Sequence, residues 1–275
     1  MALPLKHPFT AVCSGPTGSG KSELIKKLVL NAFQMVEPPP SKIVWYYAEY
    51  QDKLNRKLGH MIDFREGCPD MSEFNDNTPT LIIIDDLMSE CGVEITKIFT
   101  KGSHHRNISV IFMMQNFFHQ AKEIRTITLN AHYIILFKNP RDRLQVKTLA
   151  RQMYDGDAIA MQQAFSAATE RPHGYLLIDL KQDTLDHLRL RSKIIPGEPL
   201  EIYASKKSFK GDHIDLFRTI PIATSAGAVA SFGSTRSTPT SRICFNWCSR
   251  LLRCSSVSEK NSIVIVVSML FPTLS

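Results

Sequence analysis

The chain has 275 residues, of which 43% are hydrophobic, and its formal net charge is +7. This length and composition suit one folded domain with a well-covered core, alone or with an appendage. They exclude a chain that binds nucleic acid through a large net charge alone, but they allow binding through a local basic patch.

Apolar runs bounded by turn residues alternate with helical periodicity through most of the chain. This alternation is typical of a mostly parallel sheet flanked by helices, so we predict an α/β fold. Strands are predicted at residues 9–14, 43–48, 61–64, 81–85, 109–114 and 133–138, with a closing pair at 175–180 and 188–194. Helices are predicted at residues 21–33, 141–154 and 157–169.

The stretch SGPTGSGKS, residues 14–22, follows the first predicted strand and precedes the first predicted helix. It matches the P-loop pattern G-x-x-x-x-G-K-[ST] in the setting that this motif requires. Its glycines let backbone N–H groups point at phosphates, its Lys adds positive charge, and its Ser binds Mg²⁺. The residues predicted to hold a nucleotide are Gly15, Pro16, Thr17, Gly18, Ser19, Gly20, Lys21 and Ser22, with Ser22 also at the metal.

The apolar strand LIIIDD, residues 81–86, ends in two carboxylates. Asp85 is predicted to hold Mg²⁺ through water. Asp86 stands where hydrolytic P-loop enzymes usually carry the glutamate that polarises the attacking water, a role that the shorter Asp can fill if the water lies closer. The alternative is a core strand followed by a solvated acidic turn.

The next predicted strand ends in Gln115. Ligands of open α/β folds bind at the carboxyl edge of the sheet, so this amide is predicted to contact the γ-phosphate or to orient the water. A plain turn residue is the alternative. Met113 and Met114, just before it, are predicted to be core residues.

Arg106 lies in the polar loop KGSHHRN, residues 101–107, before that strand. We predict that it reaches a neighbouring subunit's nucleotide as an arginine finger, from the same edge of the sheet as Gln115. A solvated basic loop is an equally weighted alternative, and Arg125 competes for the same role. His104 and His105 are not predicted to bind a metal, because no third ligand is evident.

A basic stripe follows the strand at 133–138. Three of its members are spaced i, i+4, i+8 and so lie on one helical face, which suits phosphate binding. A solvated face or a subunit contact is favoured over DNA binding. Likewise, the aromatic cluster near residue 46 is predicted to pack in its strand rather than to stack on bases. The stripe is Lys138, Arg141, Arg143, Lys147 and Arg151, and the aromatic cluster is Trp45, Tyr46, Tyr47 and Tyr50.

The cysteines favour a reducing compartment inside a cell, because none of them forms a C-x-x-C pair. The N-terminal residues lack the apolar run of a secretory signal, and the apolar stretch at 263–271 is too short to span a bilayer, so no membrane association is expected. Three cysteines near the C-terminus lack a fourth zinc ligand at a plausible spacing. The six are Cys13, Cys68, Cys91, Cys244, Cys248 and Cys254.

Five stretches together resemble the genome-packaging ATPases of the FtsK/HerA superfamily, which are carried by large DNA viruses, including poxviruses, and by Maverick/Polinton-like or adintovirus-like elements. The resemblance runs from about residue 9 to residue 195. The stretches are SGPTGSGKSELIKKL, IVWYYAE, TLIIIDDL, HHRNISVIFMMQNFF and HYIILFKNPRD.

The resemblance implies a P-loop NTPase of the ASCE/RecA-like type that uses ATP and Mg²⁺. Members of this family are ring-forming motors that pump double-stranded DNA into a capsid. A homo-oligomeric ring, double-stranded DNA and a capsid or portal-type protein are therefore the expected partners. A non-motor ATP-binding protein that acts as an assembly switch is the alternative. The residues that match the family pattern are Lys21, Ser22, Asp85, Asp86 and Gln115, with Arg106 as the best match for the finger.

The expected domain limits follow the resemblance and the composition. Residues 1–195 form the P-loop ATPase domain and residues 196–219 an extension or linker. Residues 220–275 form a Ser/Thr-rich basic tail, which we expect to be weakly ordered. More than half of the net charge falls in that tail, which holds Arg236, Arg242, Arg250, Arg253 and Lys260 against Glu259 alone.

Overall fold

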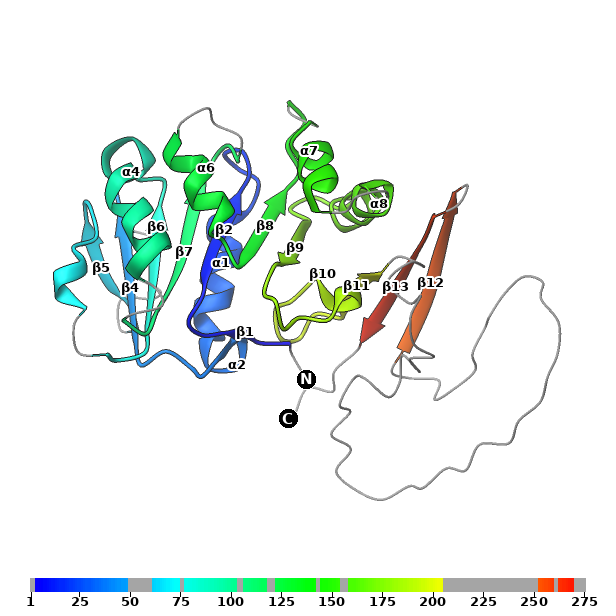
Figure 1. The fold of residues 1–275 in the computed structure, drawn as a ribbon. Coiled ribbons are helices and arrows are strands. Elements are labelled where there is room, and N and C mark those ends of the chain that lie inside the picture. The colour runs from blue at the N-terminus through cyan, green and yellow to red at the C-terminus, as the bar shows by residue number, and fades with distance from the viewer. Residues whose placement is uncertain are drawn as a thin grey trace, which may run out of the picture.

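The computed structural model describes nine segments of the chain. They are residues 3–48, 61–74, 77–102, 106–117, 122–141, 144–153, 158–204, 252–259 and 262–269. Their main feature is an 11-stranded sheet with the order β12-β13-β11-β10-β9-β8-β2-β7-β6-β4-β5 (Figure 1). A separate two-stranded sheet pairs β1 (Leu5–Lys6) with β3 (Val36–Glu37) in parallel.

The large sheet has a parallel half and an antiparallel half. In the parallel half, the buried strands β2 and β7 lie between β8 and β6, and β4 and β5 complete this half beyond β6. From β9 onward each added strand runs antiparallel to its neighbour. The prediction of a mostly parallel sheet is therefore wrong for this half, in which β9 returns antiparallel to β8 after the two helices Leu144–Met153 and Ala158–Ala168.

The strand bounds agree closely with the predicted ones. Every predicted strand is present, and the closing pair is the antiparallel pair of β9 and β10. The bounds are β2 (Thr10–Ser14), β4 (Lys42–Tyr47), β5 (Asp63–Glu66), β6 (Thr80–Asp85), β7 (Ile108–Met114), β8 (Tyr133–Phe137), β9 (Tyr175–Asp179), β10 (Leu190–Ser192), β11 (Leu200–Ala204), β12 (Leu252–Glu259) and β13 (Ser262–Met269).

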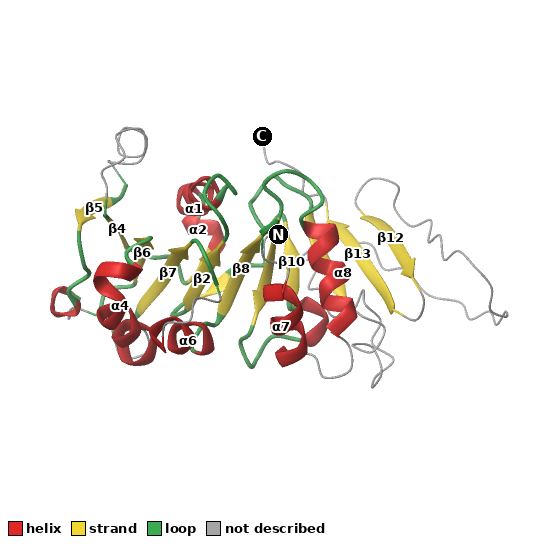
Figure 2. Cartoon of the chain, turned by 90° about the horizontal axis from the view of Figure 1, so that it is seen from above, coloured by secondary structure: helices red, strands yellow, loops and turns green. Residues whose placement is uncertain are grey.

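Helices cover both faces of the sheet (Figure 2). One face packs on α1 (Lys21–Leu30) and α2 (Ala32–Met35), and the other packs on α4, α6, α7 and α8. Side chains alternate between the faces, so Ile82 lies in one core and its neighbour Ile83 in the other. The remaining helices are α4 (Met88–Lys97), α6 (Lys122–Leu129), α7 (Leu144–Met153) and α8 (Ala158–Ala168), with single turns at Met71–Glu73, Ile98–Gly102 and Asp186–Leu188.

The first helix is shorter than the predicted range 21–33. It ends at Leu30 because Asn31, with φ −109° and ψ 20°, leaves the helical conformation and caps the carbonyl of Lys27 at 2.8 Å through its side-chain amide. Asn competes with helical backbone bonds in this way, which favours a helix end at its position.

Strands also occur within the predicted extension and the predicted tail. Strand β11 lies inside the predicted linker, and β12 and β13 lie inside the predicted tail, where β13 pairs with both β11 and β12. In the described segments the tail contributes two strands to the sheet, and the predicted domain limits stay predictions. The sequence SIVIVVSM of β13 is rich in β-branched residues and pairs with an edge that β11 would otherwise leave open. Residues 205–251 lie outside the described segments.

A disulfide joins Cys68 and Cys91, whose Cα atoms lie 5.5 Å apart. This contradicts the expectation of reduced thiols for these two residues. The pair is separated by 23 residues, so no short-range spacing signals it, and the bond forms because the segment after β5 meets the start of α4 at one edge of the sheet. Cys13 is a buried free thiol whose pKa is raised to about 12 by burial. Among the described residues, no helix combines the length and the apolar character that a membrane crossing needs.

Candidate nucleotide-binding site

The P-loop joins β2 to α1 at the carboxyl edge of the parallel strands, as predicted. Gly20 caps α1 in a left-handed conformation, with φ 105°, which side chains rarely adopt. Gly15 meets a different constraint, because a Cβ atom there would lie 2.6 Å from the Cβ atom of Phe137 in β8. The loop therefore passes close over the neighbouring strand and delivers its backbone N–H groups to the start of α1, where the helix dipole favours an anion.

Lys21 is folded over the loop. Its Nζ atom donates hydrogen bonds to the carbonyl oxygens of Gly15, at 2.6 Å, and Pro16, at 3.2 Å. Burial lowers the pKa of Lys21, and the negative charges of Asp85 and Asp86 act in the opposite direction. The ammonium group therefore lies between the loop and the acids. A phosphate chain held by the loop N–H groups would also be contacted by this ammonium group.

The two acids that end β6 have different environments. Asp85 is partly buried, and its pKa is raised first by burial and then by the charge of Asp86, while Lys21 lowers it. Asp86 is exposed and has a positive φ of 54°, and its backbone N–H donates to the carbonyl of Met113 at 3.1 Å. The turn thus leaves Asp85 partly buried and Asp86 exposed, and the negative charge of each acts on the P-loop lysine.

Gln115 lies between the P-loop and these acids, because β7 is inserted between β2 and β6. Its Nε2 atom donates a hydrogen bond to Oδ2 of Asp86 at 2.5 Å. Residues 17–24, both acids and Gln115 line one pocket of about 1280 Å³. The structure therefore brings the predicted loop, acids and amide together, and the reading of Gln115 as a plain turn residue is not supported.

Arg106 lies at the opposite edge of the sheet, so the prediction that it shares an edge with Gln115 is wrong. The strand β7 separates the two residues, and its seven residues span about 23 Å at 3.3 Å each. A loop that precedes a strand lies at the amino end of that strand, whereas Gln115 follows the carboxyl end. Arg106 instead donates a hydrogen bond to the carbonyl of Met71. The competing Arg125 is exposed in α6, the helix that follows β7.

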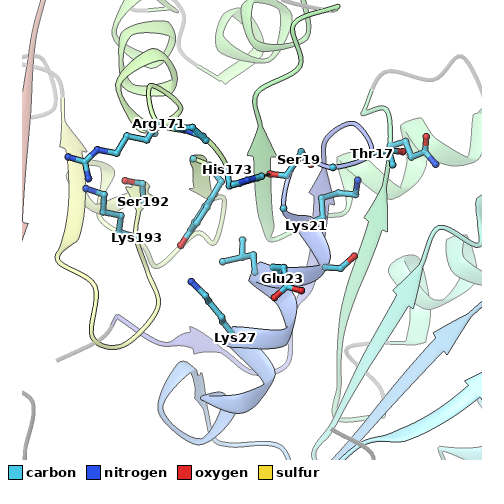
Figure 3. Close-up of a pocket in the computed structure, with 18 of the residues that line it drawn as sticks. Thr17, Ser19, Lys21, Glu23, Lys27, Arg171, His173, Ser192 and Lys193 are labelled. Atoms are coloured by element: carbon cyan, nitrogen blue, oxygen red, sulfur yellow. Dashed lines mark hydrogen bonds between the residues drawn. The ribbon is translucent and has the colours of Figure 1, made fainter. Parts of the chain in front are cut away.

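A turn that the sequence did not single out supports the P-loop. Residues 170–174 connect α8 to β9, and they reach the P-loop edge because β9 runs antiparallel to β8. Nδ1–H of His173 donates to the carbonyl of Ser19 at 3.2 Å, and a Cβ atom on Gly20 would lie 3.2 Å from Cβ of His173 (Figure 3). The motif R-P-H-G signals a turn, but its contact with residue 19 depends on strand direction.

Gly174 allows that turn to close. An added Cβ atom would lie 2.3 Å from the backbone carbonyl of Ala168. We therefore expect Gly174→Ala to lower the free energy of unfolding by about 1–3 kcal/mol, as for other overpacked sites. Urea unfolding measures this, with Ser166→Ala at an exposed position of α8 as the control, expected within about 0.5 kcal/mol of the parent. A Gly174→Ala chain as stable as the parent would contradict the close approach.

Asp85 gives a prediction with a pH dependence. Its raised pKa means that ionised Asp85 disfavours the folded state, so its contribution to stability is present at low pH and is lost as the pH rises through the folded pKa. In the absence of Mg²⁺, Asp85→Asn should therefore melt at a higher temperature than the parent at pH 7, with a smaller difference at pH 5. The exposed Glu37→Gln is the control. A lower melting temperature for Asp85→Asn at pH 7 would contradict the assignment.

Other predicted residues are confirmed in part. Trp45 and Tyr46 are buried strand residues, which confirms packing rather than stacking, and Met113 and Met114 are core residues. Tyr47 lines the pocket. Lys138, Arg141, Lys147 and Arg151 are exposed. Among the described residues, no cluster of three His, Cys, Asp or Glu side chains could hold a metal ion. The predictions for Tyr50, His104, His105, Arg143, Cys244 and Cys248 lie outside the described residues.

Comparisons with known proteins add little to this geometry. No protein-family model matches the chain, and no curated protein matches it. Among solved structures, the flagellar accessory protein FlaH from Methanocaldococcus jannaschii is similar over 50% of this chain and 75% of its own, with 13% sequence identity and a TM-score of 0.36. A likeness this low carries no argument about function.

Proposed function

We propose that the chain is a Mg²⁺-dependent ATPase whose site is the pocket at the P-loop edge. The observation that carries the proposal is the contact of Gln115 with Asp86 beside a complete P-loop. Lys21 and the loop N–H groups bind the phosphates, and Ser22 and Asp85 hold Mg²⁺. Asp86 polarises the attacking water, and Gln115 positions that carboxylate and contacts the γ-phosphate. The strand β7 between the P-loop strand and the acidic strand supports the ASCE/RecA-like type.

We further propose that ATP hydrolysis drives double-stranded DNA into a capsid. The proposal rests on the sequence resemblance to packaging ATPases, and it implies a homo-oligomeric ring inside a host cell and a capsid or portal-type partner. A ring motor needs an arginine from the neighbouring subunit, and Arg125 is the better candidate, since it is exposed on the helix that follows Gln115. Arg106, which precedes β7 and so lies at the opposite edge of the sheet, is not proposed for this role.

The rival function is an ATP-dependent assembly switch without motor activity. Both functions need the same phosphate site, so ATP binding does not separate them. The two functions are distinguished by the rate of ATP hydrolysis by the full chain, measured with and without double-stranded DNA. A motor is expected to hydrolyse ATP faster on DNA, whereas equal rates would favour the switch.

The exposed basic residues of α7 give a prediction about DNA. Lys147 and Arg151 lie four residues apart and are both exposed, so they can contact successive phosphates. Replacing both with Gln should reduce the slope of log K against log salt concentration by about 0.9 for each lost contact. Fluorescence anisotropy with duplex DNA at several salt concentrations measures the slope. The control is Lys97→Gln, an exposed site on α4. An unchanged slope would assign α7 to another role.

A further inference from the structure

The pocket continues well beyond the residues that serve the phosphates and the metal (Figure 3). Its far part lies between α1, the turn before β9 and the loop from β10 to β11, and Tyr175 lines it between these walls. The polar residues of this far part are Lys27, Glu170, Arg171, Ser192, Lys193, Glu198 and Glu201.

The strand order indicates which portion of a bound nucleotide would lie in the far part of the pocket. The acids follow β6 and Gln115 follows β7, so these groups lie on one side of the P-loop strand β2. Strands β8, β9 and β10 lie on the other side. The γ-phosphate belongs beside the acids and the water-positioning amide. The α-phosphate and the nucleoside must then extend over β8 to β10, which is where the pocket continues.

The two acids of the far part differ in their availability. Both oxygens of Glu201 are occupied: Oε1 accepts from Nζ of Lys193 at 2.5 Å, and Oε2 accepts from the hydroxyls of Ser192 and Tyr203 at 3.0 and 2.8 Å. Glu198 is partly exposed, and its Oε1 atom accepts only a long contact of 3.4 Å from Nζ of Lys27. Within the described residues, its second oxygen has no donor.

Lys27 links Glu198 to the helix that begins at the phosphate site. Lys27 comes six residues after Lys21, so it lies about 9 Å further along α1 at a rise of 1.5 Å per residue. An extended nucleotide covers a comparable span from its β-phosphate to its ribose. The 3.4 Å contact with Lys27 therefore locates the Glu198 carboxylate at the depth that a ribose would reach.

We propose that the far part of the pocket binds the ribose of a nucleoside triphosphate, with the Glu198 carboxylate accepting hydrogen bonds from the ribose hydroxyls. The inference rests on the proposed ATPase function and adds a ribose-recognition residue to it. A carboxylate suits this ligand because it only accepts hydrogen bonds and each ribose hydroxyl can donate one. Glu198 is thus a selectivity residue for ribonucleotides.

The experiment compares three ligands on the full chain by titration calorimetry with Mg²⁺. These are ATP, 2′,3′-dideoxy-ATP and inorganic tripolyphosphate. The parent is expected to bind ATP about tenfold more tightly than dideoxy-ATP, the size of a hydrogen bond to a charged group. Glu198→Ala should remove that preference and leave the affinities for dideoxy-ATP and tripolyphosphate unchanged. The matched control Lys27→Met removes the ion pair but keeps the carboxylate, so it should retain the preference.

The outcomes separate the inference from the function on which it rests. Equal affinities of the parent for ATP and dideoxy-ATP would overturn the inference, and this comparison needs no variant. A preference that persists in Glu198→Ala would overturn it as well. In both cases, tight binding of tripolyphosphate would leave the proposed phosphate site standing. A parent chain that binds none of the three ligands would overturn the proposed function itself.

Discussion

Lys21→Ala is expected to abolish productive ATP binding. The Lys21 ammonium group is the cation that the structure holds over the P-loop, where it bonds two loop carbonyls and lies in the field of both acids. Its loss removes the positive charge nearest the loop, so the phosphates would depend more on the backbone N–H groups and Mg²⁺. Because electrostatic groups in such sites are each worth about 10²–10³ in rate, we expect ATP hydrolysis to fall by at least that factor.

The measurement pairs ATP affinity with the hydrolysis rate. Lys26→Ala is the control, because Lys26 lies on the same helix but pairs with Glu23 at 2.7 Å. That variant should bind ATP at the parent level. Circular dichroism of both variants checks that α1 still forms. A Lys21→Ala chain that binds and hydrolyses ATP as the parent does would remove the phosphate site from this loop.

Local patterns were sufficient to predict that the P-loop, Asp85, Asp86 and Gln115 meet at one edge of the sheet. The P-loop depends on a contiguous motif, and Asp85, Asp86 and Gln115 each end an apolar strand whose bounds are visible in the sequence. Because neighbouring parallel strands run in the same direction, their carboxyl ends all lie at one edge of the sheet. The same rule explains why the predicted position of Arg106 is wrong, because a residue that precedes a strand lies at the opposite edge of the sheet.

The far part of the pocket could not be predicted in this way. His173 and Glu198 reach it because β9 and β11 are antiparallel additions, and strand direction at a sheet edge is a non-local property. The disulfide of Cys68 with Cys91 and the pairing of β13 with β11 have the same origin. Each joins segments whose proximity depends on the completed sheet rather than on any short stretch of sequence.

Asp86→Asn is expected to leave ATP binding intact while hydrolysis falls by about 10²–10⁴, the usual contribution of a general base. Asn has nearly the same shape as Asp, so the turn at φ 54° and the hydrogen bond from Gln115 can both persist. The change removes only the negative charge and the basic oxygen that would polarise the water. The proposed phosphate contacts of Lys21 and the proposed metal contacts of Asp85 would involve other atoms and should be unaffected.

Two further variants make the assignment of Asp86 specific. Asp86→Glu keeps a basic carboxylate one methylene further out, so it should hydrolyse ATP faster than Asp86→Asn does. Asp85→Asn should instead weaken the Mg²⁺ dependence of ATP binding, because it removes the carboxylate beside Lys21. Single-turnover hydrolysis and nucleotide affinity, measured side by side, distinguish the two acids. Parent-level hydrolysis by Asp86→Asn would mean that another group activates the water, and Gln115 would then contact a carboxylate with no role in the chemical step.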